Sequence, residues 1–252
     1  MAEEPIIRAS GLYKRFGDHE VLKGLSLDVR QGTTTVILGS SGSGKSVFMK
    51  HIIGLLTPDA GQVLIEGEDL HAASHSRRNQ IRTQFGMVFQ MAALFDSLTV
   101  YENVAFPLDE HRKSVNRRER RDKVYEKLEI LGLADSAAKY PSELSGGMRK
   151  RAGLARAVVM DPKIVLYDEP TTGLDPLTTE SVDEMIVEAS EHFGVTSIVI
   201  SHDITSALRI ADTIAFLHDG QIVEEGPPEV IGKSEHPMVS RFFSTWREGL
   251  KA

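Results

Sequence analysis

The stretch TVILGSSGSGKSVFMKHIIGLL, residues 35–56, joins a short apolar run to an amphipathic one through a segment rich in glycine and serine. The first part has the composition of a buried strand, and the last part has apolar residues at helical spacing. Between them, Gly39, Gly44, Lys45 and Ser46 fit the pattern G-x-x-x-x-G-K-[ST] of a phosphate-binding loop. The sequence therefore predicts a strand, a phosphate-binding loop and a helix, in that order.

A loop of this kind holds phosphates through its backbone. Glycines let the chain curl so that successive N–H groups face one anion, and the following helix adds the positive end of its dipole. We expect Lys45 to reach the outer phosphates and Ser46 to offer its hydroxyl to a magnesium ion. A flexible serine-glycine turn is the alternative, which the flanking strand and helix disfavour. The residues expected to contact nucleotide are Gly39, Ser40, Ser41, Gly42, Ser43, Gly44, Lys45, Ser46 and Val47.

The composition is that of an ordinary globular protein and excludes several partners. Of the 252 residues, 41% are hydrophobic and none is cysteine, which rules out disulfides and thiolate metal sites. A net charge of -7 argues against a nucleic-acid partner, whose phosphates require a basic face. The start, MAEEPIIRAS, lacks the features of a secretory signal, and no apolar run approaches the roughly 18 to 20 residues that cross a bilayer. We therefore expect any membrane role to come through a partner.

The order of strand and helix patterns predicts an α/β fold. Alternating apolar and polar residues near the N-terminus predict an antiparallel sheet, and the later patterns KIVLYDEP and VTSIVISHD enclose a helical stretch, as in a parallel sheet. In between, the stretch 109–133 places Val124, Leu128 and Leu131 at helical spacing, with Gly132 suited to the helix end. Its arginines are interpreted as a solvated helix face, with a docking patch for acidic groups as the alternative.

Two neighbouring acids and one histidine end apolar strands. Asp168 and Glu169 close IVLYDE; beside a phosphate loop, Asp168 would secure the metal and Glu169 would orient or deprotonate the attacking water. Capping of the next helix is the alternative for this pair. His202 ends the strand in VISHD, where its side chain would face the same edge of the sheet and contact the terminal phosphate. A purely structural histidine is the alternative there.

A second glycine-rich turn lies far along the chain, in ELSGGMRKRAGLARAVV, residues 143–159. Ser145, Gly146 and Gly147 open a helical pattern and present another set of free N–H groups suited to an anion. One nucleotide does not need two such loops from one fold. With this string the sequence resembles the ATP-binding cassette (ABC) ATPases, the motor subunits of ABC transporters, over nearly the whole chain.

The resemblance assigns further residues. GSSGSGKS resembles the Walker A loop, IVLYDE the Walker B strand with its catalytic glutamate, and LSGGM the ABC signature. By the same likeness, Gln90 of VFQ is the Q-loop residue, Asp175 of GLDP belongs to the D-loop and His202 is the switch histidine. Phe16 matches the aromatic residue that stacks on adenine, with Val21 nearby. The residues that the resemblance assigns to the Mg²⁺ of a bound ATP are Ser46, Gln90 and Asp168.

The ABC resemblance also implies a fold and an assembly. The fold is a P-loop NTPase core of mainly parallel sheet, formed by residues 1–90 and 161–230, with an N-terminal antiparallel β-subdomain, an inserted helical signature subdomain at 91–160 and a C-terminal extension at 231–252. Two copies would form a head-to-tail dimer, with each ATP between the Walker A loop of one subunit and the signature of the other. Hydrolysis would release the two halves, and Gln90 would transmit the change to the helical subdomain, where we expect partner contact.

Details of the signature indicate a branch of the family. LSGGM departs from the commoner form with glutamine after the glycines, and together with QMAALFDSLTVYENVAFPL it is similar to the MlaF-type ATPases of Mla and Mce lipid-transport systems. This likeness implies phospholipid cargo and maintenance of outer-membrane lipid asymmetry, from the cytoplasmic face of an inner membrane. The implied partners are an MlaE-like permease, an MCE-domain lipid-binding protein and an MlaB-like STAS-domain subunit.

Three rival functions are weighed against this one. A transporter for another cargo is the main alternative. A cassette that works outside transport is weaker, because the chain has neither long coiled coils nor zinc cysteines. A nucleotide-binding module without turnover is opposed by Glu169, which would have no reason to be there.

The tail HPMVSRFFSTWREGL places Phe242, Phe243 and Trp246 at helical spacing after Pro237, a plausible start of a helix. An apolar stripe of this kind packs either on the core of its own chain or against a partner. Here the partner would be the neighbouring ATPase or its accessory subunit, and both alternatives stay open.

Overall fold

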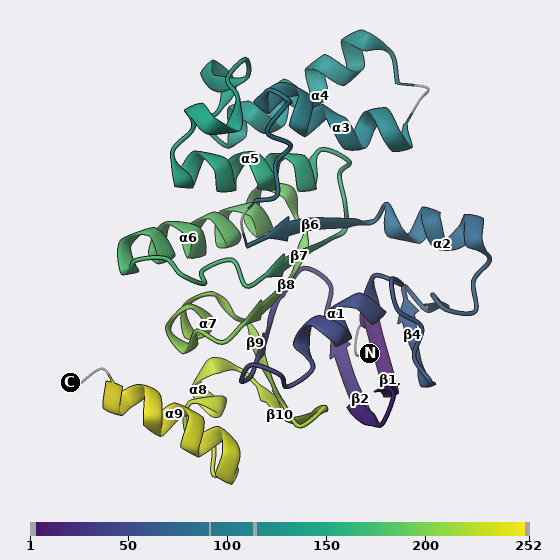
Figure 1. Ribbon diagram of the computed structural model, residues 1–252, viewed down its shortest axis with the longest axis vertical. Coiled ribbons are helices and arrows are strands. Elements are labelled where there is room, and N and C mark those ends of the chain that lie inside the picture. Colours follow the sequence, from purple (N-terminus) through teal and green to yellow (C-terminus); the bar gives the residue numbers. More distant parts are fainter. Residues whose placement is uncertain (1–3, 91, 113–114, 250–252) are drawn as a thin grey trace. The chain divides into compact units, whose positions relative to one another are not determined.

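A computed structural model describes residues 4–90, 92–112 and 115–249 of the protein (Figure 1). The chain divides into two compact units, Met1–Arg82 with Thr196–Ala252, and Thr83–Val195. Met91, where the sequence places the start of the helical region, lies outside the described residues, and the expected division into core, helical subdomain and extension stays a prediction. None of the helices in the described stretches is long and apolar enough to span a membrane.

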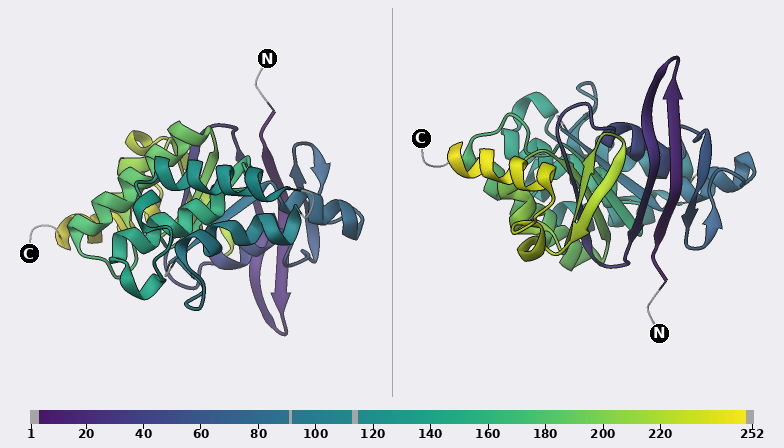
Figure 2. Two further views of the ribbon diagram at one scale, coloured as in Figure 1. Left: turned by 90° about the horizontal axis from the view of Figure 1, so that it is seen from above. Right: turned by 90° about the horizontal axis from the view of Figure 1, so that it is seen from below.

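An antiparallel sheet belongs to the first unit and has the strand order β2-β1-β4-β5. Its strands are β1 (Ile7–Phe16), β2 (His19–Val29), β4 (Ala60–Ile65) and β5 (Glu68–Asp69). β1 and β2 form a long hairpin, whose strands lie side by side in Figure 2 and close where Phe16 pairs with His19. Leu12, Leu22 and Leu25 of this hairpin are fully buried, so its apolar face contributes to the core. The predicted N-terminal antiparallel sheet is confirmed.

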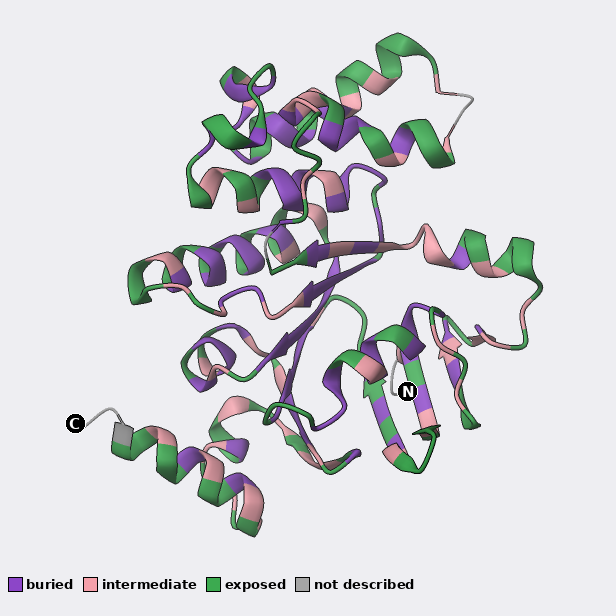
Figure 3. Cartoon of the chain, viewed as in Figure 1, coloured by how far each residue is buried: buried purple, intermediate pink, exposed green. Residues whose placement is uncertain are grey.

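A second set of strands in this unit carries the phosphate-binding loop. In the order β10-β9-β3-β8, its strands are β3 (Thr34–Leu38), β8 (Thr196–Ser201), β9 (Thr213–His218) and β10 (Gln221–Gly226). β3 is parallel to both β8 and β9, and β10 is antiparallel to β9. Every residue of β3 and β8 is buried, as expected for parallel strands covered on both faces (Figure 3). The helices of this unit are α1 (Lys45–Ile52), α2 (His75–Arg82), α7 (Ile204–Ile210), α8 (Pro228–Ile231) and α9 (Pro237–Gly249).

The second unit combines two strands with four α-helices in its described residues. β6 (Phe85–Phe89) and β7 (Ile164–Asp168) pair in parallel. The α-helices of the unit are α3 (Val100–His111), α4 (Arg117–Ile130), α5 (Gly146–Val158) and α6 (Pro176–Phe193), and two short 3₁₀ turns span Ala134–Ser136 and Pro141–Glu143. Parallel strands with helices in both units, beside an antiparallel sheet, confirm the predicted α/β class.

The charged stretch 109–133 does not form one helix. α3 ends at His111, and α4 begins where the side chain of Asn116 accepts hydrogen bonds from the first free N–H groups. Val124 and Leu128 are buried on the inner face of α4, and Gly132 takes a φ of 65° just beyond its end, as the spacing predicts.

The arginines of α4 form a solvated face. Arg117 and Arg118 are exposed, and Arg118 makes a weak i,i+4 pair with Asp122 at 3.8 Å. Arg120 donates to Asp109 of α3 at 2.6 Å. These contacts lie within the chain and agree with the solvated-face interpretation.

α9 packs on its own unit. It begins at Pro237, as predicted, and Phe243 is only 2% exposed. The ring of Phe242 lies 5.1 Å from that of Phe216 in β9, and Nε1 of Trp246 donates to the hydroxyl of Thr205 in α7 at 3.2 Å. Of the two alternatives for this apolar stripe, the contacts in the described part of the chain favour packing on its own core.

Candidate functional site

The predicted phosphate-binding loop lies between β3 and α1, and packing requires glycine at two of its positions. Gly39 follows β3, and a Cβ there would lie 2.3 Å from the carbonyl oxygen of Leu217 in β9. Gly44 has a φ of 108°, a conformation that side chains rarely adopt, and a Cβ there would lie 3.1 Å from Leu22. The two motif glycines are therefore demanded by the close approach of the neighbouring strands.

Lys45 is the first residue of α1 and turns its side chain back over the loop. Its Nζ donates to the carbonyl oxygens of Gly39 at 2.7 Å and Ser40 at 3.2 Å. Ser43 is buried, and its Oγ has no hydrogen-bond partner among the described residues. A buried hydroxyl in this state calls for an external acceptor or donor, and a phosphate oxygen meets that need. Of the other predicted contacts, Ser41, Gly42 and Ser46 are exposed and Val47 is half-buried.

His202 leaves its strand at the same edge as the phosphate loop. β3 and β8 pair in parallel with Leu38 opposite Ser201, so the next residues, Gly39 and His202, both follow the carboxyl ends of adjacent strands. The imidazole is exposed, and Asp203 after it caps α7. The first unit thus brings His202 and the loop to one edge of the sheet.

The two residues expected near adenine lie on the β1–β2 hairpin. Val21 lies against the loop: the Cβ that Gly44 lacks would come within 3.2 Å of its carbonyl oxygen and 3.6 Å of its Cγ1. Phe16, at the end of β1, is 48% exposed, with Nζ of Lys14 5.7 Å from its ring centre. The ring is therefore open to stacking by an external group.

In the second unit, Gln90 and the acidic pair lie at one edge. β6 and β7 pair in parallel with Phe89 opposite Asp168, so Gln90 and Glu169 follow neighbouring strand ends. Gln90 is exposed, whereas Asp168 and Glu169 are half-buried. Three polar residues therefore lie at the carboxyl ends of β6 and β7, the edge at which α/β proteins bind their ligands.

The helix after β7 is capped by Asp175 and not by the acidic pair. The carboxylate of Asp175 accepts hydrogen bonds from the N–H groups of Leu177 and Thr178, both at 3.1 Å. The hydroxyl of Thr178 also donates to it, and these bonds, the hydroxyl first, lower the pKa of Asp175. The alternative in which Asp168 and Glu169 cap the next helix is therefore wrong.

Glu169 has an unusual backbone conformation. Its φ is 49°, in the left-handed region, which costs a residue with a side chain on the order of 1 kcal/mol or more. The hydroxyl of Thr172 donates to its carboxylate at 2.9 Å, and the N–H of Thr172 donates to its carbonyl oxygen at 3.3 Å. Such conformations persist where the surroundings hold them, and they concentrate at active sites.

The predicted signature turn opens α5 as expected. Ser145 is the N-cap, and its Oγ accepts a hydrogen bond from the N–H of Met148 at 3.3 Å. A Cβ on Gly146 or Gly147 would meet no atom within 4 Å among the described residues, and neither glycine has a positive φ. In contrast to Gly39 and Gly44, nothing described in this chain requires glycine at these two positions.

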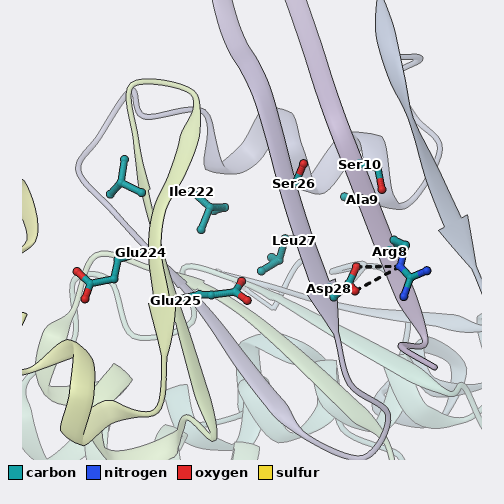
Figure 4. A pocket seen from close by; sticks show the side chains of 10 residues that line it. Arg8, Ala9, Ser10, Ser26, Leu27, Asp28, Ile222, Glu224 and Glu225 are labelled. Atoms are coloured by element: carbon teal, nitrogen blue, oxygen red, sulfur yellow. Dashed lines mark hydrogen bonds and ion pairs between the residues drawn. The ribbon is translucent and has the colours of Figure 1, made fainter. Parts of the chain in front are cut away.

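A cavity of about 470 Å³ lies elsewhere in the first unit, between the β1–β2 hairpin and β10 (Figure 4). Arg8 and Asp28 form an ion pair at its rim, with Nε of Arg8 3.2 Å from one carboxylate oxygen. Glu225 and Leu27 line it from the two sides. None of the residues predicted to bind nucleotide is among its lining residues.

Two contacts around Glu169 escape sequence analysis. One is the hydrogen bond from Thr172, and the other is made by Lys150 of α5, whose Nζ donates to the carbonyl oxygen of Pro170. Neither follows from a spacing or a motif. The first lies within the loop after β7, and the second depends on how that loop packs against α5, 20 residues earlier in the chain.

Comparison with known proteins decides the family. Residues 22–172, more than half of the chain, match the family model described as ABC transporter. The chain belongs to the ABC transporter family. The predicted resemblance is thus confirmed, and this ABC protein is the ATP-binding, ATP-hydrolysing cassette of a transporter.

Two curated relatives align with nearly the whole ABC cassette. The probable ribonucleotide transport ATP-binding protein mkl of Mycobacterium leprae is 44% identical over 96% of this chain and 70% of its own length. The intermembrane phospholipid transport system ATP-binding protein MlaF of Haemophilus influenzae is 38% identical over 97% of this chain and 92% of its own length. The two names state different cargoes.

Solved ABC cassettes share the fold. CbiO1 of Clostridium perfringens, part of the ABC transporter complex cbiONQ, has a TM-score of 0.83 at 29% identity and covers 96% of this chain and 100% of its own. The cassette MJ0796, solved as a dimer bound to ADP and Pi, has a TM-score of 0.76 at 32% identity and covers 88% of this chain and 98% of its own. The predicted ABC ATPase fold is confirmed.

Proposed function

We propose that two copies of this ABC ATPase form a head-to-tail dimer, with each ATP between the phosphate loop of one copy and the Ser145–Gly147 turn of the other. The observation that carries the proposal is the contrast between two glycine pairs. Gly39 and Gly44 are required by their own chain, whereas Gly146 and Gly147 are not. Glycines that neither packing nor backbone conformation requires leave room for a group from outside the chain. The N-terminus of α5 beside them suits an anion. The dimeric cassette MJ0796 with ADP and Pi supports the same assembly.

The loop residues suit the phosphates of ATP. Lys45 already faces two carbonyl oxygens of the loop, and its ammonium would exchange them for the outer phosphate oxygens. The buried Oγ of Ser43 would find its missing partner there. His202 would donate to the terminal phosphate from the edge that it shares with Gly39. Phe16 and Val21 would contact the adenine.

We propose Mg²⁺ as the cofactor that accompanies ATP. Ser46, Gln90 and Asp168 offer a hydroxyl, an amide oxygen and a carboxylate, the hard ligands that Mg²⁺ accepts beside phosphate oxygens and water. When bound, the ion would neutralise charge on the phosphates. Glu169 would orient and deprotonate the attacking water, with its carboxylate positioned by Thr172. In this scheme Asp175 would lie at the dimer contact.

We further propose that the transported cargo is phospholipid. MlaF, whose name states intermembrane phospholipid transport, matches this chain over most of both sequences. The partners would be an MlaE-like permease, an MCE-domain lipid-binding protein and an MlaB-like STAS-domain subunit, at the cytoplasmic face of an inner membrane. This activity would maintain outer-membrane lipid asymmetry. A cassette for another cargo, such as the ribonucleotides in the name of mkl, is the second candidate.

Apolar rings in the second unit are suited to contact the permease. Phe95 and Phe106 stack with their ring centres 4.8 Å apart and are 43% and 38% exposed. Phe89, the residue before Gln90, is 39% exposed. Exposed aromatic residues in a group mark protein contacts. A permease bound here would be next to the Q-loop.

The Glu169→Gln variant tests the shared site. Gln keeps the shape of the side chain but removes the base, so ATP binding persists while hydrolysis falls by about a hundredfold or more. We expect a stable ATP-bound dimer, detected by size-exclusion chromatography with ATP and Mg²⁺. Lys45→Ala is the matched control, because it removes the phosphate contact and should give no ATP-dependent dimer. Turnover of Glu169→Gln at the wild-type rate, or a monomer that encloses ATP alone, would refute the proposed function.

A further inference from the structure

The loop that carries Glu169 is attached to the signature helix by a lysine. Lys150 lies in the second turn of α5, and its Nζ donates a hydrogen bond to the carbonyl oxygen of Pro170, the residue after Glu169. The side chain is half-buried, and none of the ion pairs in the described part of the chain includes it. Both groups belong to the second unit, so the contact lies within one compact body.

The charged form of Lys150 is disfavoured in this half-buried environment. Lysine normally keeps its ammonium in water, and removal of that water without a carboxylate nearby disfavours the charge. The pKa of Lys150 is accordingly lowered by burial. The carbonyl oxygen of Pro170 compensates in part, because a hydrogen bond from a charged donor is stronger than one between neutral groups.

The loop after β7 needs such an attachment. Glu169 holds a left-handed φ of 49°, which relaxes unless neighbouring groups fix the chain on both sides. Thr172 holds its carboxylate and its carbonyl oxygen. Pro170 has no N–H to bond, so its carbonyl oxygen is the backbone group by which the loop is held there.

We propose that Lys150 is a positioning residue for Glu169, which acts by holding the carbonyl oxygen of Pro170 so that the Glu169 carboxylate faces the attacking water. This inference rests on the proposed catalytic role of Glu169. Ser145, the residue proposed to face the ATP of the other copy, is the N-cap of α5. Lys150 therefore joins the loop that serves one ATP to the helix that serves the second ATP.

The test compares Lys150→Met with Lys150→Arg in the full-length chain. Met keeps the length of the side chain but removes the donor, so we expect kcat for ATP hydrolysis to fall roughly tenfold while KM for ATP and the melting temperature stay within error. Arg retains a donor and should restore kcat to within about twofold of wild type. Lys139→Met, which changes an exposed lysine of the same unit, is the control and should behave as wild type.

The dimer provides a readout that a merely structural role would not give. Because binding groups stay intact, Lys150→Met should accumulate an ATP-bound dimer on size-exclusion chromatography, as Glu169→Gln does. Since both changes act on the same step, adding Lys150→Met to Glu169→Gln should lower kcat no further.

Three outcomes would overturn the positioning role. They are a wild-type kcat in Lys150→Met, a melting temperature that falls together with kcat and is not rescued by Arg, and loss of the ATP-bound dimer, which would place the effect at the signature turn. If Glu169→Gln is inactive while Lys150→Met is normal, only the positioning role fails. If Glu169→Gln itself turns over normally, the proposed function fails and the positioning role with it.

Discussion

His51 is a buried side chain on the helix that follows the phosphate loop. It is 0% exposed, and its Nδ1 lies 2.6 Å from the carbonyl oxygen of Val47, while Nε2 has no hydrogen-bond partner among the described residues. His71 lies beside it, with Nε2 3.1 Å from the carbonyl oxygen of His51. Burial is the main cause that lowers the pKa of both rings, and Lys14 lowers that of His51 further.

Acid should therefore destabilise the chain through His51. A histidine whose pKa is lower in the folded state adds stability above its unfolded pKa of about 6.5, and this stability is lost as pH falls below that value. The slope is at most about 1.4 kcal/mol per pH unit for each proton taken up. Urea unfolding of the full chain between pH 8 and pH 5.5 measures it.

His51→Gln and His75→Gln provide the comparison for this pH effect. The first removes a buried titrating ring and should flatten the slope, whereas the second changes an exposed residue of α2 and should leave it unchanged. An unchanged slope in His51→Gln would show that other groups govern the acid response.

Single residues differ in how far the sequence predicts them. Gly39, Lys45 and Ser46 are predictable because a phosphate loop fixes their spacing through its own backbone. The lack of room for a side chain at Gly39 and Gly44 agrees with this motif. Lys150 is not predictable, because its partner lies 20 residues away, in a loop with no regular structure. Local patterns encode local geometry, and contacts between distant side chains fall outside them.

At the level of elements, spacing predicts that a helix exists and caps decide where it begins. The apolar spacing of Val124 and Leu128 identifies the inner face of α4, but the start at Arg117 is set by Asn116. Likewise, α1 ends at Ile52, earlier than the apolar pattern of 47–56 suggests, because the chain enters a turn with Gly54 at a φ of 70°.

α9 should contribute to the stability of the first unit through Phe243. This ring is 2% exposed and lies 6.3 Å from the ring of Trp246. Phe243→Ala leaves a cavity, so we expect the free energy of unfolding to fall by about 3 kcal/mol or more. Arg241→Ala, at an exposed position of the same helix, should change it by about 0.5 kcal/mol at most.

Urea unfolding measures this difference, and size-exclusion chromatography with ATP separates it from an interface role. If Phe243→Ala kept its stability but lost the ATP-dependent dimer, the stripe would be a contact between copies instead of part of the core.

On the scale of the whole molecule, the cargo depends on partners that the cassette does not contain. We expect a tagged full-length chain, extracted from membranes in detergent, to copurify with a polytopic permease and an MCE-domain protein, identified by mass spectrometry. Lys45→Ala should retain both, because docking of apolar rings does not require hydrolysis. A permease recovered with no MCE-domain protein would assign the cassette to another cargo.

The sequence predicts the strands and helices of the chain better than it predicts which of them pack together. The sequence predicts parallel strands but not which of them are neighbours. The observed parallel pairing of β3 with β8 brings Gly39 and His202, which are far apart in the sequence, to one edge. The assembly of α9 on β9 and α7 was left open by the sequence, since an apolar stripe does not identify the surface that covers it.

In the proposed head-to-tail dimer, a change at Gly146 or Gly147 would act on the ATP bound by the other copy. A methyl group added there would meet no described atom of its own chain, so we expect the altered protein to fold and to bind nucleotide. In a head-to-tail dimer of one altered and one wild-type subunit, the added methyl group would obstruct the ATP that the wild-type subunit binds. In a cell that makes both forms equally, random pairing would leave most assemblies with at least one obstructed site, so the defect would be dominant.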